Sequence, residues 1–445
     1  MENNKVIHYV LKHDNVKSLY MIFIVSASVF LDVWDLTAFS FVLTLFKATF
    51  LPTGILLGLS VAGANLGGIA GAILGGYLTD YIGRKRMLIY NMVAFVVFAF
   101  LIAVSTNLYE FIIFRIILGF SIGADVTTGF SYIYEYISLR QRTKFYSLWA
   151  YSFAVVALIA VFTVFLLYHL VQNIIIWRYI FVIGGVFAAI ILILRSKLRE
   201  TPVWLYYNGD SKGAESIIRE VYGDTLIIDK QDKQERSLKD IVRVYRSGLN
   251  KEIIFTYSLN CIVGFIGWGF AFYITYMLFE LHFISFFQIL EADSIIYFFG
   301  FLGAIISPFI SRKFGIYKAS VIPSIIAAIS LFLLFTVFSN ILPGYFIIPL
   351  SAIIIFFNYA GPMAYNAVLN SFIPSKIRGT ANGQNYMVNK IVEAGSGFAG
   401  GFLLITIGLR YNTLVLAFIV FSLVLIASIT GRSRYFTSNM KSDYK

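Results

Sequence analysis

Six charged side chains stand inside long apolar stretches of this sequence. They are Asp32, Asp35, Arg115, Asp125, Lys390 and Glu393. A charge at the centre of a lipid bilayer costs about 2.5–3.5 kcal/mol on insertion scales, so such residues face the interior of a helix bundle and are candidates for function. The acids outnumber the bases by four to two. Because a buried acid without a base holds a proton or binds a cation, we predict coupling to an ion, with H⁺ as the first choice.

The spacing of these residues predicts which of them meet. Asp32 and Asp35 are three positions apart, which brings both side chains to one face of a helix. At about 1.5 Å per residue over a core of about 30 Å, these acids and Arg115 lie at a similar depth. We predict an acid–arginine pair in which one acid takes the proton and the other gates it or touches the substrate; a static salt bridge is the alternative. Lys390 and Glu393 have the same spacing, and they could simply neutralise each other.

The chain that positions these charges has 445 residues, of which 59% are hydrophobic and 13% are charged. Average soluble domains carry about 25% charged residues, so a water-soluble multidomain protein is excluded, and intrinsic disorder is excluded as well. Cys261 is the single cysteine, which excludes a disulfide scaffold. We predict an all-α polytopic membrane protein. Twelve apolar runs are long enough to span a bilayer: 19–46, 54–78, 88–106, 110–134, 145–169, 174–194, 253–279, 288–311, 319–339, 343–370, 382–407 and 411–431.

A charged segment divides the twelve spans into two sets of six. We expect a cytoplasmic N-terminus over 1–18, a six-helix bundle over 19–194, a cytoplasmic linker with short amphipathic helices over 195–252, a second bundle over 253–431 and a cytoplasmic tail over 432–445. Most of the 35 Lys and Arg residues then lie on the cytoplasmic side of a plasma-membrane protein, as the positive-inside rule requires. The net charge of +12 is therefore a topology signal, and no nucleic-acid partner is expected.

The two halves carry traces of an internal repeat. At an offset of 232, residues 71–73 and 303–305 are both Gly-Ala-Ile, and at an offset of 236 the segment 136–142 aligns with 372–378. Two six-helix halves related by a repeat are the layout of many secondary transporters, with the substrate at the midplane between the halves. Chance similarity between apolar helices is the alternative.

The loop after the second span carries the most specific motif. The stretch 76–86, with Asp80, Gly83 and Arg84, resembles the hallmark loop of the major facilitator superfamily. The resemblance implies the major facilitator fold and a gate whose Asp and Arg join helices to hold the outward-facing state. The alternative to a gating role is that the basic residues only follow the positive-inside rule, but this rule does not explain Asp80. The implied gating residues are Gly76, Asp80, Gly83, Arg84, Lys85, Glu135, Arg140, Arg142 and Arg378.

Other stretches resemble narrower branches of this superfamily. The stretch 199–205 resembles the signature after the sixth helix of sugar porters, and 32–35 resembles the first-helix pattern of phosphate, aromatic-acid and nicotinate-type proton symporters. Lys390 and Asp125 match positions of the phosphate-symporter group, which implies an anion ligand and a protonatable or substrate site, respectively. Gly269 stands where phosphate symporters have Asp, and the seventh-helix Gln pair of sugar porters is absent. These differences argue against both inorganic phosphate and hexose as the substrate.

Two sets of residues follow from the buried charges and the resemblance. Proton coupling is assigned to Asp32, Asp35, Arg115 and Asp125. Substrate binding is assigned to Lys390, Glu393, Trp149, Trp268, Tyr273, Tyr276, Asn358, Tyr365 and Asn366. Aromatic residues in membrane spans more often serve packing or the interface belt.

We predict a secondary active transporter that moves a small polar metabolite by alternating access, through proton-coupled symport of an organic anion or sugar-like solute. A proton-coupled antiporter and a non-transporting receptor with the same fold are the alternatives. The four His residues lack metal-ligand spacing, and the sequence has neither a nucleotide-binding loop nor a nucleophile–base constellation. We therefore expect no enzyme activity, no metal and no cofactor, with H⁺ as coupling ion. The expected partners are a small-molecule substrate and the lipid bilayer, and the chain is expected to act as a monomer.

Overall fold

Helices account for all regular structure in the computed structural model over the residues that it describes, which are 5–13, 16–228, 250–280, 285–361 and 378–432. In these ranges, nine helical segments are long and apolar enough to cross a membrane. Two shorter apolar helices, Val155–Val171 and Gly344–Ala360, and the helix α17 (Arg378–Thr406) stand at the fifth, tenth and eleventh predicted positions.

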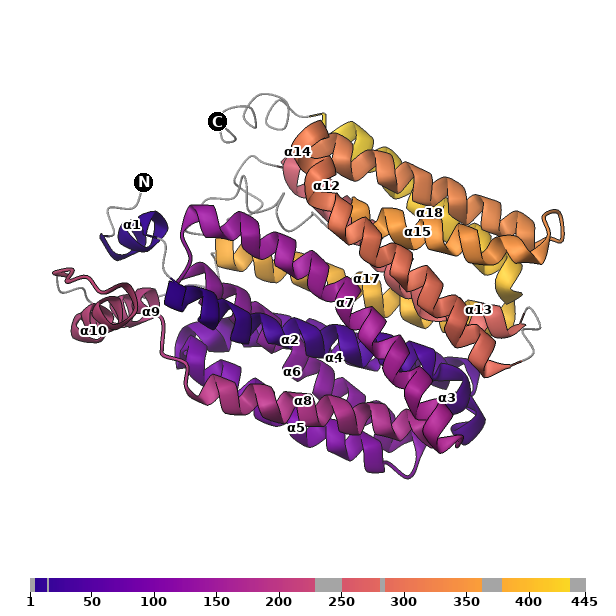
Figure 1. Ribbon diagram of the computed structural model, residues 1–445, viewed down its shortest axis with the longest axis horizontal. Coiled ribbons are helices and arrows are strands. Elements are labelled where there is room, and N and C mark those ends of the chain that lie inside the picture. The colour runs from indigo at the N-terminus through magenta and orange to yellow at the C-terminus, as the bar shows by residue number, and fades with distance from the viewer. Residues whose placement is uncertain (1–4, 14–15, 229–249, 281–284, 362–377, 433–445) are drawn as a thin grey trace.

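The first six spans form the N-terminal bundle, which runs from indigo to magenta in Figure 1. Its boundaries follow from local chemistry. Gly83, with φ of 112°, separates the second span from the third, and the Asn107 side chain accepts a hydrogen bond from Glu110 N at the start of the fourth. The helices are α2 (Val16–Phe41) and α3 (Leu43–Phe50), which share the first span, then α4 (Gly54–Ile82), α5 (Arg84–Val104), α6 (Leu108–Tyr134), α7 (Leu139–Val171) and α8 (Ile176–Ser196).

Three short helices lie together at one end of this bundle, at the left in Figure 1. They are α1 (Lys5–Lys12), α9 (Pro202–Tyr207) and α10 (Ser211–Tyr222). Their apolar faces share a small separate core of Val6, Val203, Ala214, Ile218 and Ile228. Short amphipathic helices are what the sequence predicts for the linker. We call this end of the molecule the linker end and the opposite end the loop end.

The C-terminal bundle contains the remaining six spans. The seventh is interrupted, because a π-helix and a 3₁₀ turn separate its two α-helices, and π segments inside helices often mark functional sites. The eighth and ninth form one continuous element with a kink at Gly315, whose φ is 77°. The elements are α12 (Asn250–Gly264), η1 (Phe265–Phe270), η2 (Ala271–Tyr273), α13 (Ile274–Glu280), α14 (Phe286–Phe338), η3 (Gly344–Phe346), α15 (Ile347–Ala360), α17 (Arg378–Thr406) and α18 (Gly408–Thr430).

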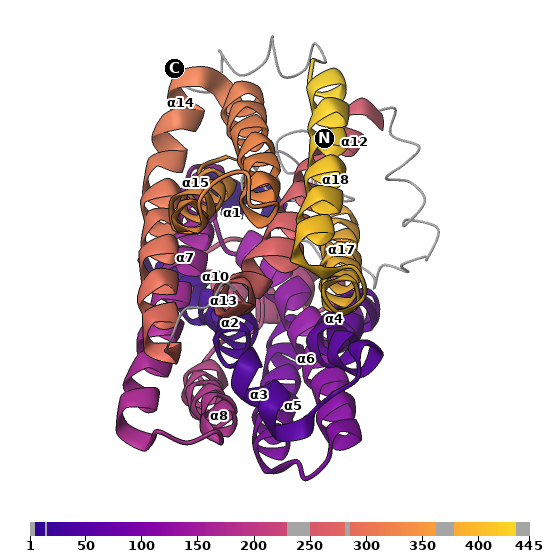
Figure 2. The same ribbon diagram turned by 90° about the vertical axis from the view of Figure 1, so that its right-hand side faces the viewer.

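The two bundles meet along two pairs of helices. α4 packs against α17 on one side, and α7 packs against α14 on the other, as Figure 2 shows from the loop end. Nearer the loop end, aromatic side chains join the bundles. The ring centroids of Phe165 and Phe287 are 4.4 Å apart, and Lys47 Nζ lies 4.1 Å from the centroid of the Tyr276 ring. The bundles are therefore held together by side-chain packing at the loop end.

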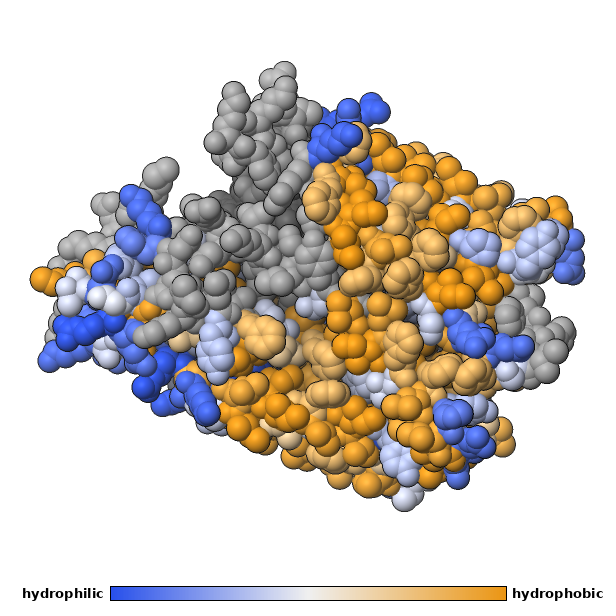
Figure 3. Space-filling model, viewed as in Figure 1, coloured by the Kyte–Doolittle hydropathy of each residue, from blue (hydrophilic) through white to orange (hydrophobic). Residues whose placement is uncertain are grey.

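The visible surface in Figure 3 carries a broad apolar band over the middle of the bundle, with hydrophilic residues towards both ends. A bilayer requires this distribution, because its hydrocarbon core accepts apolar side chains and backbone that is already hydrogen-bonded. The prediction of an all-α polytopic membrane fold is confirmed.

Glycines allow α4 and α6 to approach until their backbones are in contact. A Cβ at Gly67 or Gly71 would collide with the carbonyl group of Ile116 or Phe120, respectively, and a Cβ at Gly123 would collide with the carbonyl group of Gly68. Small residues at such crossings allow close packing in membranes, where helix association depends on van der Waals contact. The glycine-rich face of α4 therefore fixes the core of the N-terminal bundle.

We expect Gly71→Val to lower the melting temperature of the purified protein by several degrees, because overpacking typically costs about 1–3 kcal/mol or more. Gly76→Ala is the matched control on the same helix, since a Cβ at Gly76 meets nothing within 4 Å. Thermal unfolding in detergent measures both variants. Equal melting temperatures for the two variants would contradict the close α4–α6 contact.

Candidate functional site

Lys390 of α17 lies between two carboxylates where the bundles meet. Its Nζ donates to Asp32 Oδ1 of α2 at 3.2 Å and to Glu393 Oε2 at 3.0 Å. Asn65 Oδ1 of α4 accepts from the same Nζ at 3.4 Å, and the Tyr386 hydroxyl donates to Asp32 Oδ2 at 3.1 Å. All five side chains are buried. We call Asp32, Lys390 and Glu393 the inter-bundle triad.

The charge balance of this triad is uneven. The three N–H groups of the Lys390 ammonium are all used, on Asp32, Glu393 and Asn65. Two ionised carboxylates would then share one cation, which leaves one negative charge uncompensated in a buried place. A proton on either acid removes that excess. The surplus of acids predicted from the sequence is thus located at the contact between the bundles.

The second acid of the first span faces its own bundle. Arg115 Nη1 donates to both carboxylate oxygens of Asp35 at 2.9 Å, so the predicted acid–arginine pair is present in the structure. Both residues are buried, and the guanidinium lies 4.6 Å from the Phe39 ring centroid and 5.5 Å from that of Phe181. Arg115 Nε and Nη2 have no hydrogen-bond partner. Asp32 and Asp35 therefore have different partners although they stand on the same helix.

Asp125 is paired with a base that the sequence analysis placed at the first position of the linker. Arg195 lies fully buried in the last turn of α8, and its Nη1 and Nη2 donate to the two Asp125 oxygens at 2.6 and 3.1 Å. The same guanidinium donates to the carbonyl oxygens of Leu88 and Val25, each at 3.2 Å. Arg195 thus ties four spans of the N-terminal bundle together. The predicted proton-coupling role of Asp125 stays a prediction, and its geometry is that of an internal ion pair.

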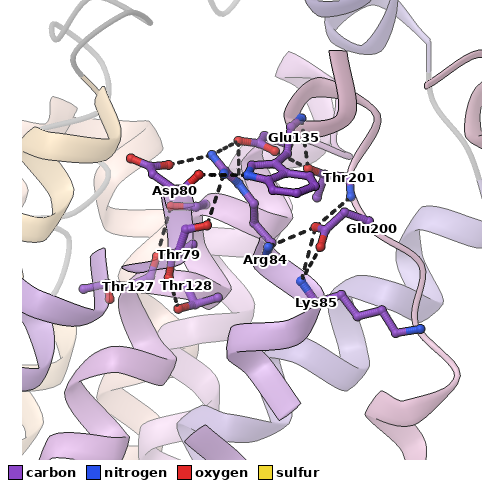
Figure 4. A network of polar contacts seen from close by, with 11 residues as sticks. Thr79, Asp80, Arg84, Lys85, Thr127, Thr128, Glu135, Glu200 and Thr201 are labelled. Carbon is purple, nitrogen blue, oxygen red and sulfur yellow. Dashed lines mark hydrogen bonds and ion pairs between the residues drawn. The ribbon is translucent and has the colours of Figure 1, made fainter. Parts of the chain in front are cut away.

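A second polar network lies at the linker end, drawn in Figure 4. Arg84 Nη2 donates to Asp80 Oδ1 and to Glu135 Oε1, each at 2.8 Å. The Thr201 hydroxyl donates to Glu135, and Trp204 Nε1 donates to the Asp80 carbonyl oxygen at 3.0 Å. The predicted gating residues Asp80, Arg84 and Glu135 therefore converge. The hydrogen bonds of Thr201 and Trp204 join this part of the N-terminal bundle to the start of the linker.

Glu200, to which the sequence analysis gave no role, covers the amino-terminal end of α5. Its carboxylate accepts from Arg84 N at 3.0 Å and from Lys85 N at 3.1 Å, which suits the positive end of a helix. Gly83 is required here, because its φ is 112° and a Cβ would lie 2.6 Å from Glu200 Oε2. Burial raises the pKa of the Glu200 carboxyl above its usual range, against the backbone N–H donors that lower it.

Some of the predicted substrate residues lie beside the triad. Trp268 of η1 lies against Glu393 and stacks on Phe272, with ring centroids 5.3 Å apart. The Tyr273 hydroxyl donates to the Gly397 carbonyl oxygen of α17. Tyr276 instead lies nearer the loop end, beside Lys47. Of the aromatic residues predicted to bind substrate, Trp268 is thus the one that the described part of the structure places against a triad carboxylate.

Other predicted residues are elsewhere. Asn358 is buried in α15, and its Oδ1 has no hydrogen-bond partner. A Cβ added at Gly76 would meet nothing within 4 Å. Lys85 joins the linker-end network through its backbone N–H, which donates to Glu200. The predictions for the side chains of Arg140, Arg142, Trp149 and Arg378, and for Tyr365 and Asn366, lie outside the residues described.

The sequence pattern of the Major Facilitator Superfamily matches residues 25–397. The chain belongs to this superfamily. Among curated relatives, the glucose transporter GlcP of Staphylococcus epidermidis is 28% identical over 190 residues, which are 43% of this chain and 41% of GlcP. The arabinose-proton symporter of Bacillus subtilis is 25% identical over 215 residues, which are 44% of each chain. The matches thus span less than half of the length of these relatives.

Solved structures agree with the fold over nearly the whole chain. The xylose transporter XylE from Escherichia coli, in a partially occluded inward open conformation, superposes with a TM-score of 0.77 at 20% identity. The superposition covers 92% of this chain and 96% of XylE. The predicted major facilitator fold, with twelve spans in two bundles, is confirmed.

Asp125→Asn is expected to destabilise the protein strongly, because breaking a buried ion pair leaves Arg195 without its counter-charge and typically costs about 3–5 kcal/mol. Thermal unfolding of the purified variant measures the loss. The paired variant Asp125→Asn with Arg195→Met removes both charges and is expected to recover part of it. A single variant as stable as the wild type would show that the Asp125–Arg195 pair contributes little to the fold.

The stability conferred by Glu200 is expected to depend on pH. Since its folded-state pKa is raised, the protonated form is favoured by folding, and this contribution is lost as pH rises above the ordinary value of 4.5. The melting temperature of the wild type relative to Glu200→Gln should therefore fall as pH rises from mildly acidic to alkaline values. A difference that increases with pH would contradict the sign of the shift.

Proposed function

We propose that this protein is a secondary active transporter that carries a small organic anion together with a proton by alternating access. In this proposal the linker end faces the cytoplasm of a plasma membrane, and the solute binds between the bundles at the inter-bundle triad. The observation that carries the proposal is the position of Lys390. Its ammonium stands at the contact between the bundles and is bonded to a carboxylate of each.

The triad gives a physical reason for linking an anion to a proton. A carboxylate or similar group on the solute would compete with Asp32 and Glu393 for the Lys390 ammonium. With both acids ionised, an added anion would bring the site to two excess negative charges, which a buried site resists. Protonation of Asp32 or Glu393 offsets one of them. Anion binding and proton uptake therefore favour each other, which is the linkage that symport needs.

The same contact explains why binding would act on the movement of the bundles. Asp32 belongs to the N-terminal bundle, whereas Lys390 and Glu393 belong to the C-terminal bundle. When a proton neutralises Asp32, the attraction that joins the bundles at this point weakens, and the solute takes over the contact with Lys390. The linker-end network of Asp80, Arg84 and Glu135 is then proposed to control the closing of that end.

A sugar-like solute is the second candidate. Relatives with specific names include a glucose transporter and an arabinose-proton symporter, and XylE is a xylose transporter. Trp268 beside the triad offers an aromatic face, and Asn65 and the two carboxylates offer acceptors for hydroxyl groups. A neutral solute would not need the positive charge of Lys390, and this difference separates the two candidates.

We expect Lys390→Ala to abolish proton-driven uptake of an organic anion in proteoliposomes, or to raise its apparent KM by about 10- to 100-fold. Charged hydrogen bonds of about 1.5–3 kcal/mol correspond to this range. Uptake of a panel of labelled organic acids and sugars, with a pH gradient imposed in either direction, is the measurement. Lys212→Ala, at an exposed position of α10, is the control and should transport like the wild type.

Other outcomes would change the conclusion. If Lys390→Ala took up a neutral sugar with an unchanged apparent KM, the substrate would be a sugar and not an organic anion. Uptake driven only when the proton gradient opposes the solute would indicate antiport. Specific binding without any uptake by the wild type would indicate a receptor.

A further inference from the structure

Another acid, Asp293, is buried in the C-terminal bundle, away from the triad. Asp293 of α14 is fully buried, and its Oδ2 accepts a hydrogen bond from the Thr275 hydroxyl of α13 at 2.7 Å. Its Oδ1 has no hydrogen-bond partner. Within the described part of the chain, none of the ion pairs includes Asp293. This carboxyl group is therefore half satisfied, and no described base offsets its charge.

The depth of Asp293 makes its ionised form expensive. It stands seven residues after Phe286, the first residue of α14, so it is about 10 Å below the loop end of the helix. Of the described titratable groups, Tyr297 on its own helix interacts with Asp293, and Tyr297 interacts in turn with Tyr359 of α15. The Tyr297 hydroxyl donates instead to the Ala271 carbonyl oxygen at 3.3 Å. Binding a proton removes the cost of a buried carboxylate with no cation beside it.

Asp293 also contacts the interrupted part of the seventh span. Thr275 comes two residues after the 3₁₀ turn η2, and the Ala271 carbonyl lies within that turn. Asp293 and Tyr297 are four residues apart, so both side chains leave the same face of α14. Through Thr275 and the Ala271 carbonyl oxygen they hold the interruption and the start of α13 against α14.

This part of the seventh span contacts the other bundle. The Phe272 and Phe39 ring centroids are 6.1 Å apart, and Tyr276 carries Lys47 on its ring face. A change in how α13 packs on α14 would therefore alter the contacts between the bundles near the loop end.

We propose that Asp293 is a second proton-binding site, in the C-terminal bundle, and that its protonation keeps the loop end closed by holding α13 against α14. Loss of the proton leaves a buried carboxylate whose unpartnered Oδ1 must gain water or another donor, and admitting that donor separates α13 from α14 and favours opening. The proton comes from and returns to the aqueous phase at the loop end. This site is separate from the inter-bundle triad, and it requires no particular solute.

The test is a pH titration of the distance across the loop end. Ile55 and Ile341 lie at the loop end of different bundles and are 56% and 71% exposed, so both can be replaced by spin-labelled Cys in a Cys261→Ser background. Spin–spin distances are measured in nanodiscs without solute, from about pH 5 to about pH 9. The labelled parent is expected to populate longer distances as pH rises. Asp293→Asn, which keeps an acceptor for Thr275 but cannot ionise, should retain the short distances throughout.

Two further variants keep the test informative if Asp293→Asn folds poorly. Thr275→Val removes the one donor to the carboxylate, and it should move the midpoint of the opening transition up by about half to one pH unit. Ser294→Ala is the control, because the Ser294 hydroxyl bonds within its own helix, to the Leu290 carbonyl oxygen. It should titrate like the labelled parent.

Three results would overturn the proposal. These are a loop-end distance that does not change with pH, an Asp293→Asn transition identical to that of the parent, or a Thr275→Val midpoint that does not move. A response to Na⁺ at constant pH that Asp293→Asn abolishes would assign a metal cation to the site in place of the proton. Because no solute is present, these results are independent of the uptake measurements on Lys390.

Discussion

The cost of placing a charge in hydrocarbon is the constraint on which this structure depends. Among the described residues, the buried bases of the spans are matched to carboxylates: Arg115 to Asp35, Arg195 to Asp125, and Lys390 and Arg84 each to two acids. The helices are thus arranged so that each of these bases has a carboxylate partner, and the groups left without a full counter-charge are acids. Acids can shed their charge by taking a proton, whereas an arginine cannot. The excess therefore sits on the groups that are able to respond to the proton concentration.

The ion pairs divide by what they join. Arg115–Asp35 and Arg195–Asp125 each lie within the N-terminal bundle, so neither pair depends on the contact between the bundles. In the described part of the chain, Lys390–Asp32 is the ion pair that joins one bundle to the other. Electrostatic coupling between proton occupancy and bundle position can therefore be concentrated at Asp32. Its neighbour Asp35, one helical turn away, is paired with Arg115 among aromatic rings of its own bundle, and its predicted role in proton coupling stays a prediction.

Much of this arrangement could be predicted from the sequence, because hydropathy and helical spacing are local properties. The twelve spans follow from run length, the Lys390–Glu393 contact from i,i+3 spacing, and a pair between Arg115 and one acid of the first span from their similar depth, although depth alone does not distinguish Asp35 from Asp32. The sequence does not indicate that Arg195 is buried, because it stands at the edge of a charged segment, where a cation usually reaches water. Asn65 and Tyr386 gave no signal, since a single polar residue in a span does not reveal its partner. The sequence does not single out Asp293, because an acid near the start of a span is usually a residue of the membrane interface.

Gly68 shows how a residue without a side chain can position a charge. A Cβ at Gly68 would lie 3.3 Å from Lys390 Cδ and 3.4 Å from Cγ, so the lysine stem lies directly on the bare backbone of α4. The opposite side of α4 is locked to α6, which prevents the helix from moving away. The Lys390 stem therefore passes against α4 on its way to Asp32, at a point where a larger residue than glycine would crowd it. The reach of the cation across the bundle boundary is thus determined by the neighbouring helix as much as by the length of the lysine itself.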